Sequence, residues 1–271
     1  MVKPKDFRSR FGFHATPFTR EIAVKDRFPL PDFDQATEAL LATLDARMSC
    51  ALIAPAGTGK TSILRAVLAR LPEARYRTHY VKVTGLSKRD MCREIAFAIG
   101  LAPAGTYPAL VRRLQEHFLE SASTGGVRPV LLLDEAHDLR VDTLAMLRVL
   151  TNFEMDSKLV LSVVLAGQPR LRELLRRQDL EDVARRLAHY ATLRVLSRDE
   201  VASYIEHRCT VAGATKVPFD KGGIDALFEI GRGNLRATDQ LARKGLELAH
   251  EHDHDVCGSS HVAHARKLLW P

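Results

Sequence analysis

The chain has 271 residues, enough for one large domain or two small ones, and its 46% apolar content is sufficient for a hydrophobic core. Its 40 Lys and Arg residues against 33 Asp and Glu residues leave a formal charge of +7, which is compatible with nucleic acid binding without establishing it. No apolar stretch approaches the roughly 18 residues of a membrane span, and the four widely separated cysteines support neither a zinc ribbon nor a disulfide framework. With no apolar signal-peptide core near the N-terminus, these features predict a cytoplasmic protein with reduced thiols and no membrane partner.

The first 33 residues predict an irregular extension. Prolines interrupt any long helix in this stretch, and phenylalanines are gathered in it. We expect residues 1–33 to wrap around the core. From Asp34 to Arg47 the apolar residues recur at helical spacing, which predicts the first long helix.

A phosphate-binding loop follows the first predicted strand, at about residues 50–54. The segment Ala54-Pro-Ala-Gly-Thr-Gly-Lys-Thr61 lies between this apolar run and a helical pattern, which is the context such a loop requires. Gly57 and Gly59 let backbone N–H groups turn toward phosphate oxygens, and the next helix adds partial positive charge at its N-terminus. Ala54 stands where the first glycine of the pattern is usual.

The loop predicts ATP and Mg²⁺ as ligands. Lys60 is expected to reach the β- and γ-phosphates, and the Thr61 hydroxyl to bind Mg²⁺. The predicted nucleotide-binding residues of the loop are Pro55, Ala56, Gly57, Thr58, Gly59, Lys60, Thr61 and Ser62.

Two carboxylates end the strand predicted at 129–134. The run Pro129-Val-Leu-Leu-Leu-Asp-Glu-Ala-His137 is apolar on both faces, which is typical of a strand in the middle of a parallel sheet. Ligands bind at the carboxyl ends of such strands. Asp134 is expected to hold Mg²⁺ through its water shell, and Glu135 to polarise the water that attacks the γ-phosphate. A kinase needs no such glutamate, so the pair favours hydrolysis; alternatively, Glu135 is a solvated residue that opens a helix.

The order of elements predicts an α/β fold. Five candidate strands alternate with helical patterns, which indicates a parallel five-stranded sheet covered on both faces over residues 34–196. The strands are expected at about 50–54, 79–84, 129–134, 160–166 and 191–196.

From Ser197 onward the strands stop. Ser197-Arg-Asp-Glu200 is a capping box that opens a helix to about Cys209. Further helical patterns at about 220–230, 235–250 and 259–269 predict a small all-helical domain over residues 197–271. The histidine-rich run from His250 to Asp255 is better explained as a solvated linker between two of these helices than as a metal site, because it offers no tetrahedral ligand set.

Three further motifs resemble those of the ExeA/TniB/TnsC group of AAA+ ATPases. They are Phe11-Gly-Phe-His-Ala-Thr-Pro-Phe18, Leu165-Ala-Gly-Gln-Pro-Arg-Leu171 and Gly233-Asn-Leu-Arg236, in the order and spacing of that group. The resemblance covers nearly the whole chain and implies a P-loop AAA+ three-layer αβα nucleotide domain followed by a helical lid. Secretion members of the group carry a membrane span and further domains, whereas this sequence ends at Pro271 and shows no integrase-type domain. It therefore resembles the transposon-encoded members more closely.

The resemblance also implies roles for residues outside the loop. Gln168 resembles the sensor 1 residue, which contacts the γ-phosphate or the attacking water, and Arg236 resembles sensor 2. Arg185 and Arg186 precede the fifth strand, where the arginine finger acts on a neighbouring subunit's ATP. Which of the two is the finger stays open. The plainer alternatives are a loop glutamine and surface arginines.

The resemblance implies an ATP-dependent homo-oligomer, a ring or helical filament, on duplex DNA. Phosphate contacts suffice for binding that is independent of base sequence. Candidates for these contacts are Lys82, Thr84, Lys88 and Arg89; alternatively, Ser87 caps a helix to about Ile99 and the last two are solvated residues of its first turn.

The implied function is regulation of target selection and recruitment of a transposase or target selector in DNA transposition. One alternative is a secretion-type ATPase that acts on a protein assembly without DNA. Another is a nucleotide-gated scaffold with negligible hydrolysis, and a small-molecule kinase is more distant.

Overall fold

The computed structural model describes residues 6–83 and 85–270. The chain separates into two compact units. The α/β unit contains residues 30–56 and 60–193, and the helical unit contains residues up to 29, residues 57–59 and residues from 194 onward. The sequence places the corresponding boundaries after residues 33 and 196, a few residues later in each case.

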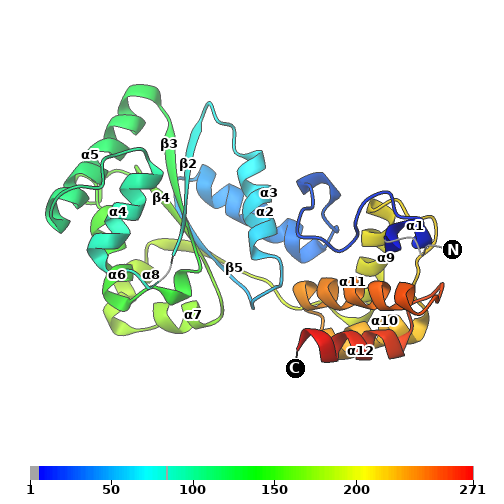
Figure 1. Cartoon of the computed structure of the whole chain (residues 1–271). Coiled ribbons are helices and arrows are strands. Elements are labelled where there is room, and N and C mark those ends of the chain that lie inside the picture. The colour runs from blue at the N-terminus through cyan, green and yellow to red at the C-terminus, as the bar shows by residue number, and fades with distance from the viewer. Residues whose placement is uncertain (1–5, 84, 271) are drawn as a thin grey trace. The chain divides into compact units, whose positions relative to one another are not determined.

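A parallel five-stranded sheet forms the centre of the α/β unit, in the order β2-β3-β4-β1-β5 (Figure 1). Its strands are β1 (Ser49–Ile53), β2 (Tyr76–Lys82), β3 (Arg128–Asp134), β4 (Ser162–Gly167) and β5 (Leu187–Thr192). Every residue of β1 and β4 is buried, as expected for inner strands that are covered on both faces.

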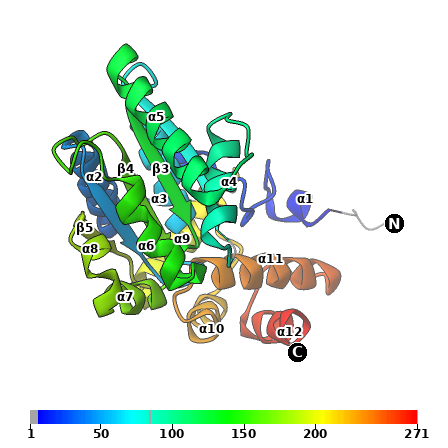
Figure 2. The ribbon, with the colours of Figure 1, turned by 90° about the vertical axis from the view of Figure 1, so that its left-hand side faces the viewer.

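Helices cover both faces of this sheet. On one face lie α2 (Pro31–Asp45) and α3 (Lys60–Arg70); on the other lie α4 (Lys88–Ala98), α5 (Tyr107–Gly125) and α6 (Val141–Leu150), which stand in front of the strands in Figure 2. The shorter elements are η2 (Ala136–Asp138), α7 (Arg170–Leu175), η3 (Gln178–Leu180) and α8 (Glu181–Ala184). This is the three-layer αβα arrangement that the sequence predicts.

The two edge strands lie elsewhere than predicted. β2 begins at Tyr76 rather than near residue 79, and β5 spans Leu187–Thr192 rather than 191–196. An edge strand leaves alternate side chains in water, so these strands contain exposed residues such as Arg77 and lack the continuous apolar run used to find the inner strands. Helix α2 begins at Pro31 rather than at the predicted Asp34. Proline is tolerated there because the N–H that it lacks would have no partner in the first turn of a helix.

The helical unit consists mainly of four helices. They are α9 (Arg198–Val211), α10 (Lys221–Gly231), α11 (Leu235–Glu251) and α12 (Ser259–Leu269), and they are preceded by α1 (Phe7–Phe11) and η1 (Val24–Asp26). The predicted capping box begins α9: the Ser197 hydroxyl accepts the Glu200 N–H at 3.3 Å, and the Glu200 carboxylate accepts the Ser197 N–H at 2.7 Å. A hydrogen bond from Arg194 is the main cause that lowers the pKa of Glu200 to about 2.

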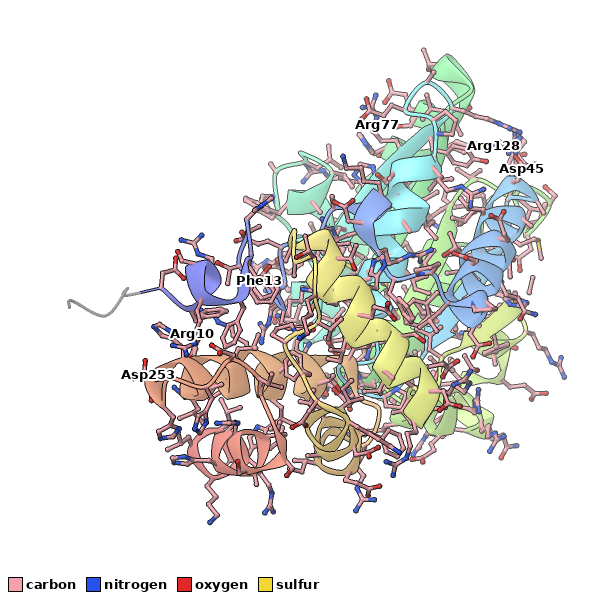
Figure 3. The ribbon with its side chains drawn as sticks, turned by 90° about the vertical axis from the view of Figure 1, so that its right-hand side faces the viewer. Arg10, Phe13, Asp45, Arg77, Arg128 and Asp253 are labelled. Atoms are coloured by element: carbon pink, nitrogen blue, oxygen red, sulfur yellow. The ribbon has the colours of Figure 1, made fainter. Side chains whose placement is uncertain are left out.

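Residues 6–29 pack within the helical unit, whereas the sequence predicts an extension over residues 1–33 that wraps around the core. The ring of Phe18 lies edge-on against Phe219 at 6.0 Å, and the His14 N–H donates to the Ala212 carbonyl at 2.8 Å. Arg10 holds the loop after α11 through the carboxylates of Asp253 and Asp255, at 3.2 and 2.9 Å (Figure 3). Phe18 and Phe28 thus have their aromatic partners, Phe219 and Tyr204, far along the chain, which sequence proximity does not indicate.

A buried polar network joins this segment to α9 and α11. The Arg208 guanidinium donates to the Tyr204 hydroxyl at 3.1 Å and to the Thr19 carbonyl at 2.8 Å. Tyr204 in turn donates to Asp239 at 2.7 Å. Burial raises the pKa of the Asp239 carboxyl to about 6, although the charge of Arg208 acts in the opposite direction.

No helix within residues 6–83 and 85–270 combines the length and the apolar content needed to cross a membrane.

Candidate nucleotide-binding site

Three neighbouring strands bring the glycine-rich loop, Gln168 and the acidic pair to the carboxyl ends of the strands, at one edge of the sheet. The glycine-rich loop follows Ile53 of β1, Gln168 follows Gly167 of β4, and Asp134 ends β3. Because β3, β4 and β1 are parallel neighbours, their carboxyl ends meet at this edge (Figure 1). The Ala54 N–H donates to the Gly167 carbonyl at 3.0 Å, which joins the start of the loop to the end of β4.

The glycine-rich loop has the backbone that anion binding requires. Gly57 and Gly59 have φ values of 75° and 101°, in the region that favours glycine. Thr58 is buried, and Thr61 is exposed in the first turn of α3. The ammonium of Lys60, itself buried, donates to the Ala54 carbonyl at 3.1 Å and to the Pro55 carbonyl at 3.3 Å. A buried cation beside left-handed glycines at a helix start is a donor set that fits a polyphosphate.

The loop tip groups with the helical unit, where the Gly-Asn-Leu-Arg motif surrounds Gly57. The Arg236 N–H donates to the Gly57 carbonyl at 3.1 Å, and a Cβ at Gly57 would lie 2.4 Å from the Asn234 side chain. Asn234 caps α11 by accepting the Ala237 N–H at 3.1 Å. Gly233 has φ 70°, and a Cβ there would lie 2.0 Å from the Leu196 carbonyl oxygen. In this motif Gly233 allows close approach to Leu196, Asn234 caps α11, and the side chain of Arg236 is exposed.

The acidic pair is held in a defined geometry after β3. Asp134 is buried, and its Oδ1 accepts the N–H of Glu135 at 2.9 Å. Its Oδ2 accepts the hydroxyl of Tyr80, on β2, at 3.0 Å. Burial first, and then the charge of Asp134, raises the pKa of Tyr80 to about 12, so the hydroxyl stays a donor. Carboxylate and hydroxyl oxygens such as those of Asp134 and Thr61 are the ligands Mg²⁺ prefers, so these residues fit the metal.

Glu135 has a backbone conformation that is rare for its residue type. Its φ of 59° lies in the left-handed region, which costs a residue with a Cβ about 1–2 kcal/mol. His137 is buried beside it, with Nδ1 3.4 Å from Glu135 Oε2 and Nε2 3.6 Å from Asp138 Oδ1. Glu135 is the residue directly before η2, and the imidazole of His137 limits where its carboxylate can lie. Such strained conformations persist where function requires them.

The two candidate arginines differ in their surroundings. Both follow α8 and directly precede β5. Arg185 is 73% exposed and pairs with Glu181 at 2.6 Å, one helical turn away. Arg186 is 29% exposed and makes a two-pronged contact with Asp156, with Nη1 2.8 Å from Oδ1. Both line an open cavity of about 770 Å³, which lies at the amino-terminal edge of the sheet and away from the glycine-rich loop.

The described candidates for DNA contact lie at the end of β2 and in the first turn of α4. Lys82 ends β2 opposite Asp134 in the strand register. The Lys88 ammonium lies 3.9 Å from Asp142, and Arg89 donates to the Gly105 carbonyl at 3.1 Å. Ser87 does cap α4, by accepting the Asp90 N–H at 3.2 Å. Thr84 lies outside the described residues.

Sequence reasoning missed three residues of these sites. Tyr80 contacts Asp134, which is 54 positions away, and Asp156 contacts Arg186, which is 30 positions away. Only strand pairing and loop folding reveal these contacts. His137 did have a signal, because it lies two residues after Glu135 in the same run. As for the histidine-rich stretch, His254 Nδ1 and His261 Nε2 lie 2.8 Å apart, and the described part of the chain contains no group of three or more side chains arranged to hold a metal.

Known sequences are similar to this chain in two ways. Residues 43–175 match the family model described as "AAA domain". The chain is also 32% identical over 195 residues to "General secretion pathway protein A" of Aeromonas hydrophila, a match that covers 71% of this chain. It spans only 35% of the length of that relative.

Solved structures share the fold. The chain is similar to Cdc6p from Pyrobaculum aerophilum, with a TM-score of 0.73 and 16% identity over 93% of this chain and 70% of that one. It is also similar to the Aeropyrum pernix ORC1 protein in complex with DNA, with a TM-score of 0.70 and 19% identity over 95% of this chain and 70% of that one. At these identities the likeness concerns the fold. Residues 43–175 are therefore similar to an AAA domain, within a fold that these solved structures share.

Proposed function

We propose that this protein is a Mg²⁺-dependent ATP hydrolase that assembles on duplex DNA and regulates target selection or transposase recruitment in transposition. The observation that supports hydrolysis best is the meeting of the glycine-rich loop, Asp134 and Glu135 at the carboxyl edge of β1 and β3. A phosphate cradle beside a metal-facing carboxylate and a second, strained carboxylate suits attack by water on a phosphate.

Each residue of the site has a separate task in this proposal. Bound Mg²⁺–ATP supplies the phosphoryl group and the counter-charge for its transfer. The Lys60 ammonium and the N–H groups of the loop neutralise phosphate oxygens, while Thr61 and Asp134 hold the metal. Glu135 orients the attacking water and accepts its proton. Gln168 follows β4, which lies between β3 with its acidic pair and β1 with the glycine-rich loop. Its side chain fixes the position of that water or of the γ-phosphate.

The sheet also supports action between subunits. Leu187, which follows the two candidate arginines, is opposite Ser49 at the start of β1, whereas the glycine-rich loop follows Ile53 at the other end of that strand. About five residues of strand separate these ends, a distance of about 15 Å. Arg185 and Arg186 therefore lie at the edge of the sheet opposite the chain's own nucleotide site, and a homo-oligomer would bring one of them to a neighbour's ATP.

The proposed DNA contact is electrostatic. The net charge of +7 favours phosphate contacts, and the family resemblance supports a filament or ring on duplex DNA. Lys82, Lys88 and Arg89 are the proposed contacts on the α/β unit, although Lys88 and Arg89 must exchange their present partners to bind phosphate.

A second candidate function is a secretion-type ATPase that acts on a protein assembly without DNA. The 32% identity to General secretion pathway protein A specifically favours it. The nucleotide site would be the same in both functions, so the two differ only in whether DNA changes turnover. A scaffold with negligible hydrolysis would show no turnover under either condition.

ATP hydrolysis should be measured with and without duplexes of unrelated sequence, across a series of salt concentrations. If the protein hydrolyses ATP after it assembles on DNA, every duplex should stimulate turnover. This stimulation should disappear as the salt concentration rises, because binding through phosphate contacts releases counterions. Turnover that DNA leaves unchanged would support the secretion-type function. Nucleotide binding without turnover would support the scaffold.

A further inference from the structure

We propose that Tyr80 is a positioning residue for Asp134, and that its hydroxyl sets the affinity of the nucleotide site for Mg²⁺. The inference rests on the proposed function in one respect, since it takes Asp134 to be the carboxylate that faces the metal. Neither the glycine-rich loop nor the acidic pair includes Tyr80, which comes from a different strand.

The register of β2 and β3 makes this contact possible. Tyr80 is opposite Leu132 and Lys82 is opposite Asp134, so Tyr80 and Asp134 share a face of the sheet and are offset by two residues. Two residues of strand span about 6.6 Å. A tyrosine side chain that leans along its strand covers this offset, and its Oη reaches Asp134 Oδ2 at 3.0 Å. Serine or threonine at position 80 would be too short.

The contact completes a restraint on the aspartate. Oδ1 of Asp134 accepts the Glu135 N–H at 2.9 Å, and Oδ2 accepts the Tyr80 hydroxyl. With one donor on each oxygen, the carboxylate cannot rotate without breaking a hydrogen bond. Each oxygen still has a lone pair for a water of the metal's shell. The restraint therefore orients Asp134 without occupying all of its capacity to bind.

Packing does not account for this tyrosine. Tyr80 is 46% exposed, and it is on an edge strand where a polar or β-branched side chain would be tolerated. The hydroxyl group, rather than the ring, is the part of Tyr80 with a specific partner.

Tyr80→Phe tests the inference because it removes one oxygen atom and keeps the ring. Partners that orient a metal ligand contribute roughly 10- to 100-fold to metal affinity. We expect the Mg²⁺ concentration for half-maximal binding of a fluorescent ATP analogue to rise about 10-fold. Binding of the analogue in EDTA should not change. Hydrolysis should fall at low Mg²⁺ and recover at high Mg²⁺.

Tyr190→Phe is a matched control. Tyr190 is on the other edge strand, is 38% exposed, and donates its hydroxyl to the Ala184 carbonyl at 3.1 Å. This variant should keep the parental Mg²⁺ dependence, and thermal melting should show both variants folded. A parental Mg²⁺ dependence in Tyr80→Phe would overturn the inference, as would an equal shift in Tyr190→Phe.

The outcome separates this inference from the proposed function. If the parent protein binds the analogue with Mg²⁺ but does not hydrolyse ATP, the proposed hydrolysis fails while the binding titration still decides the role of Tyr80. If the parent shows no Mg²⁺-dependent nucleotide binding, both proposals fail. If the parent hydrolyses ATP and only the Tyr80 titration is unshifted, the inference alone fails.

Discussion

At the residue scale, the site depends on a few side chains whose surroundings differ from what their residue types usually have. Lys60 is a buried cation, Asp134 a buried carboxylate, and Glu135 a residue with positive φ. Each of these conditions destabilises a fold unless a partner compensates for it. Their concentration in one short loop and one strand end indicates a ligand of high charge.

The first prediction separates binding from turnover. Glu135→Gln should keep nucleotide binding, because the amide preserves shape, while turnover falls by about 10²- to 10⁴-fold through loss of the general base. Lys60→Ala should abolish nucleotide binding. An assay of ATP-analogue binding and phosphate release on the same preparations checks both. Parental turnover in Glu135→Gln would show that another group activates the water.

The second prediction distinguishes the two candidate arginines. Arg185 is the more exposed of the two and pairs with Glu181, whereas Arg186 is clamped to Asp156. We therefore expect Arg185→Ala to lower turnover of the assembled protein by about 10³- to 10⁵-fold without loss of stability. Arg186→Ala should lower the melting temperature.

Asp156→Ala is the control for the clamp. It should reproduce the stability loss of Arg186→Ala and leave turnover near the parental value. If Arg186→Ala abolishes turnover while Asp156→Ala raises it, Arg186 is the finger and Asp156 restrains it.

At the element scale, the helical unit is joined by polar contacts as well as by apolar packing. Arg208 on α9, Asp239 on α11 and the Thr19 carbonyl form one buried network. Burial disfavours the ionised form of Asp239 more than the charge of Arg208 and the hydrogen bond from Tyr204 favour it. This network therefore makes the packing of the N-terminal segment sensitive to the protonation of Asp239.

The third prediction concerns pH. The pKa of Asp239 rises from 3.8 to about 6 on folding, so between these values the folded state keeps a proton that the unfolded state releases. The raised pKa of Asp239 therefore adds about 3 kcal/mol to the free energy of unfolding below pH 4. This contribution is lost as the pH rises through 6.

Denaturant unfolding at pH 4 and pH 7 tests this directly. Asp239→Asn should remove the contribution of this group to the difference in the free energy of unfolding between pH 4 and pH 7, whatever its effect on absolute stability. Glu206→Gln, an exposed carboxyl on α9, should leave the parental change intact. The same pH dependence in Asp239→Asn as in the parent would contradict the assignment.

At the whole-molecule scale, the proposed activity belongs to an assembly rather than to one chain. The candidate arginines and the glycine-rich loop lie at opposite edges of the same sheet, so hydrolysis should depend on protein concentration. Sedimentation with ATP and DNA should show assembly of Glu135→Gln and none of Lys60→Ala. Turnover per chain that stays constant on dilution would contradict action between subunits.

The sequence by itself determined the type of fold, and it located the glycine-rich loop and the acidic pair that are proposed as the site. The inner strands were readable because burial on both faces requires continuous apolar runs, as in β3, and the glycine-rich loop because its chemistry is local. The same local rules located the capping box at Ser197 and the cap at Ser87. The tasks of Glu135, Gln168, Arg236 and the two arginines remain predictions.

The tertiary structure alone decided what depends on distant segments. It placed β2 and β5, whose exposed faces carry no apolar run, and it paired Phe18 with Phe219. It also paired Tyr80 with Asp134 and Asp156 with Arg186. Local sequence patterns reflect which side chains of a segment are exposed to water and which hydrogen bonds form within its own backbone. The pairings named above depend instead on strand register and on loops that bring remote residues together.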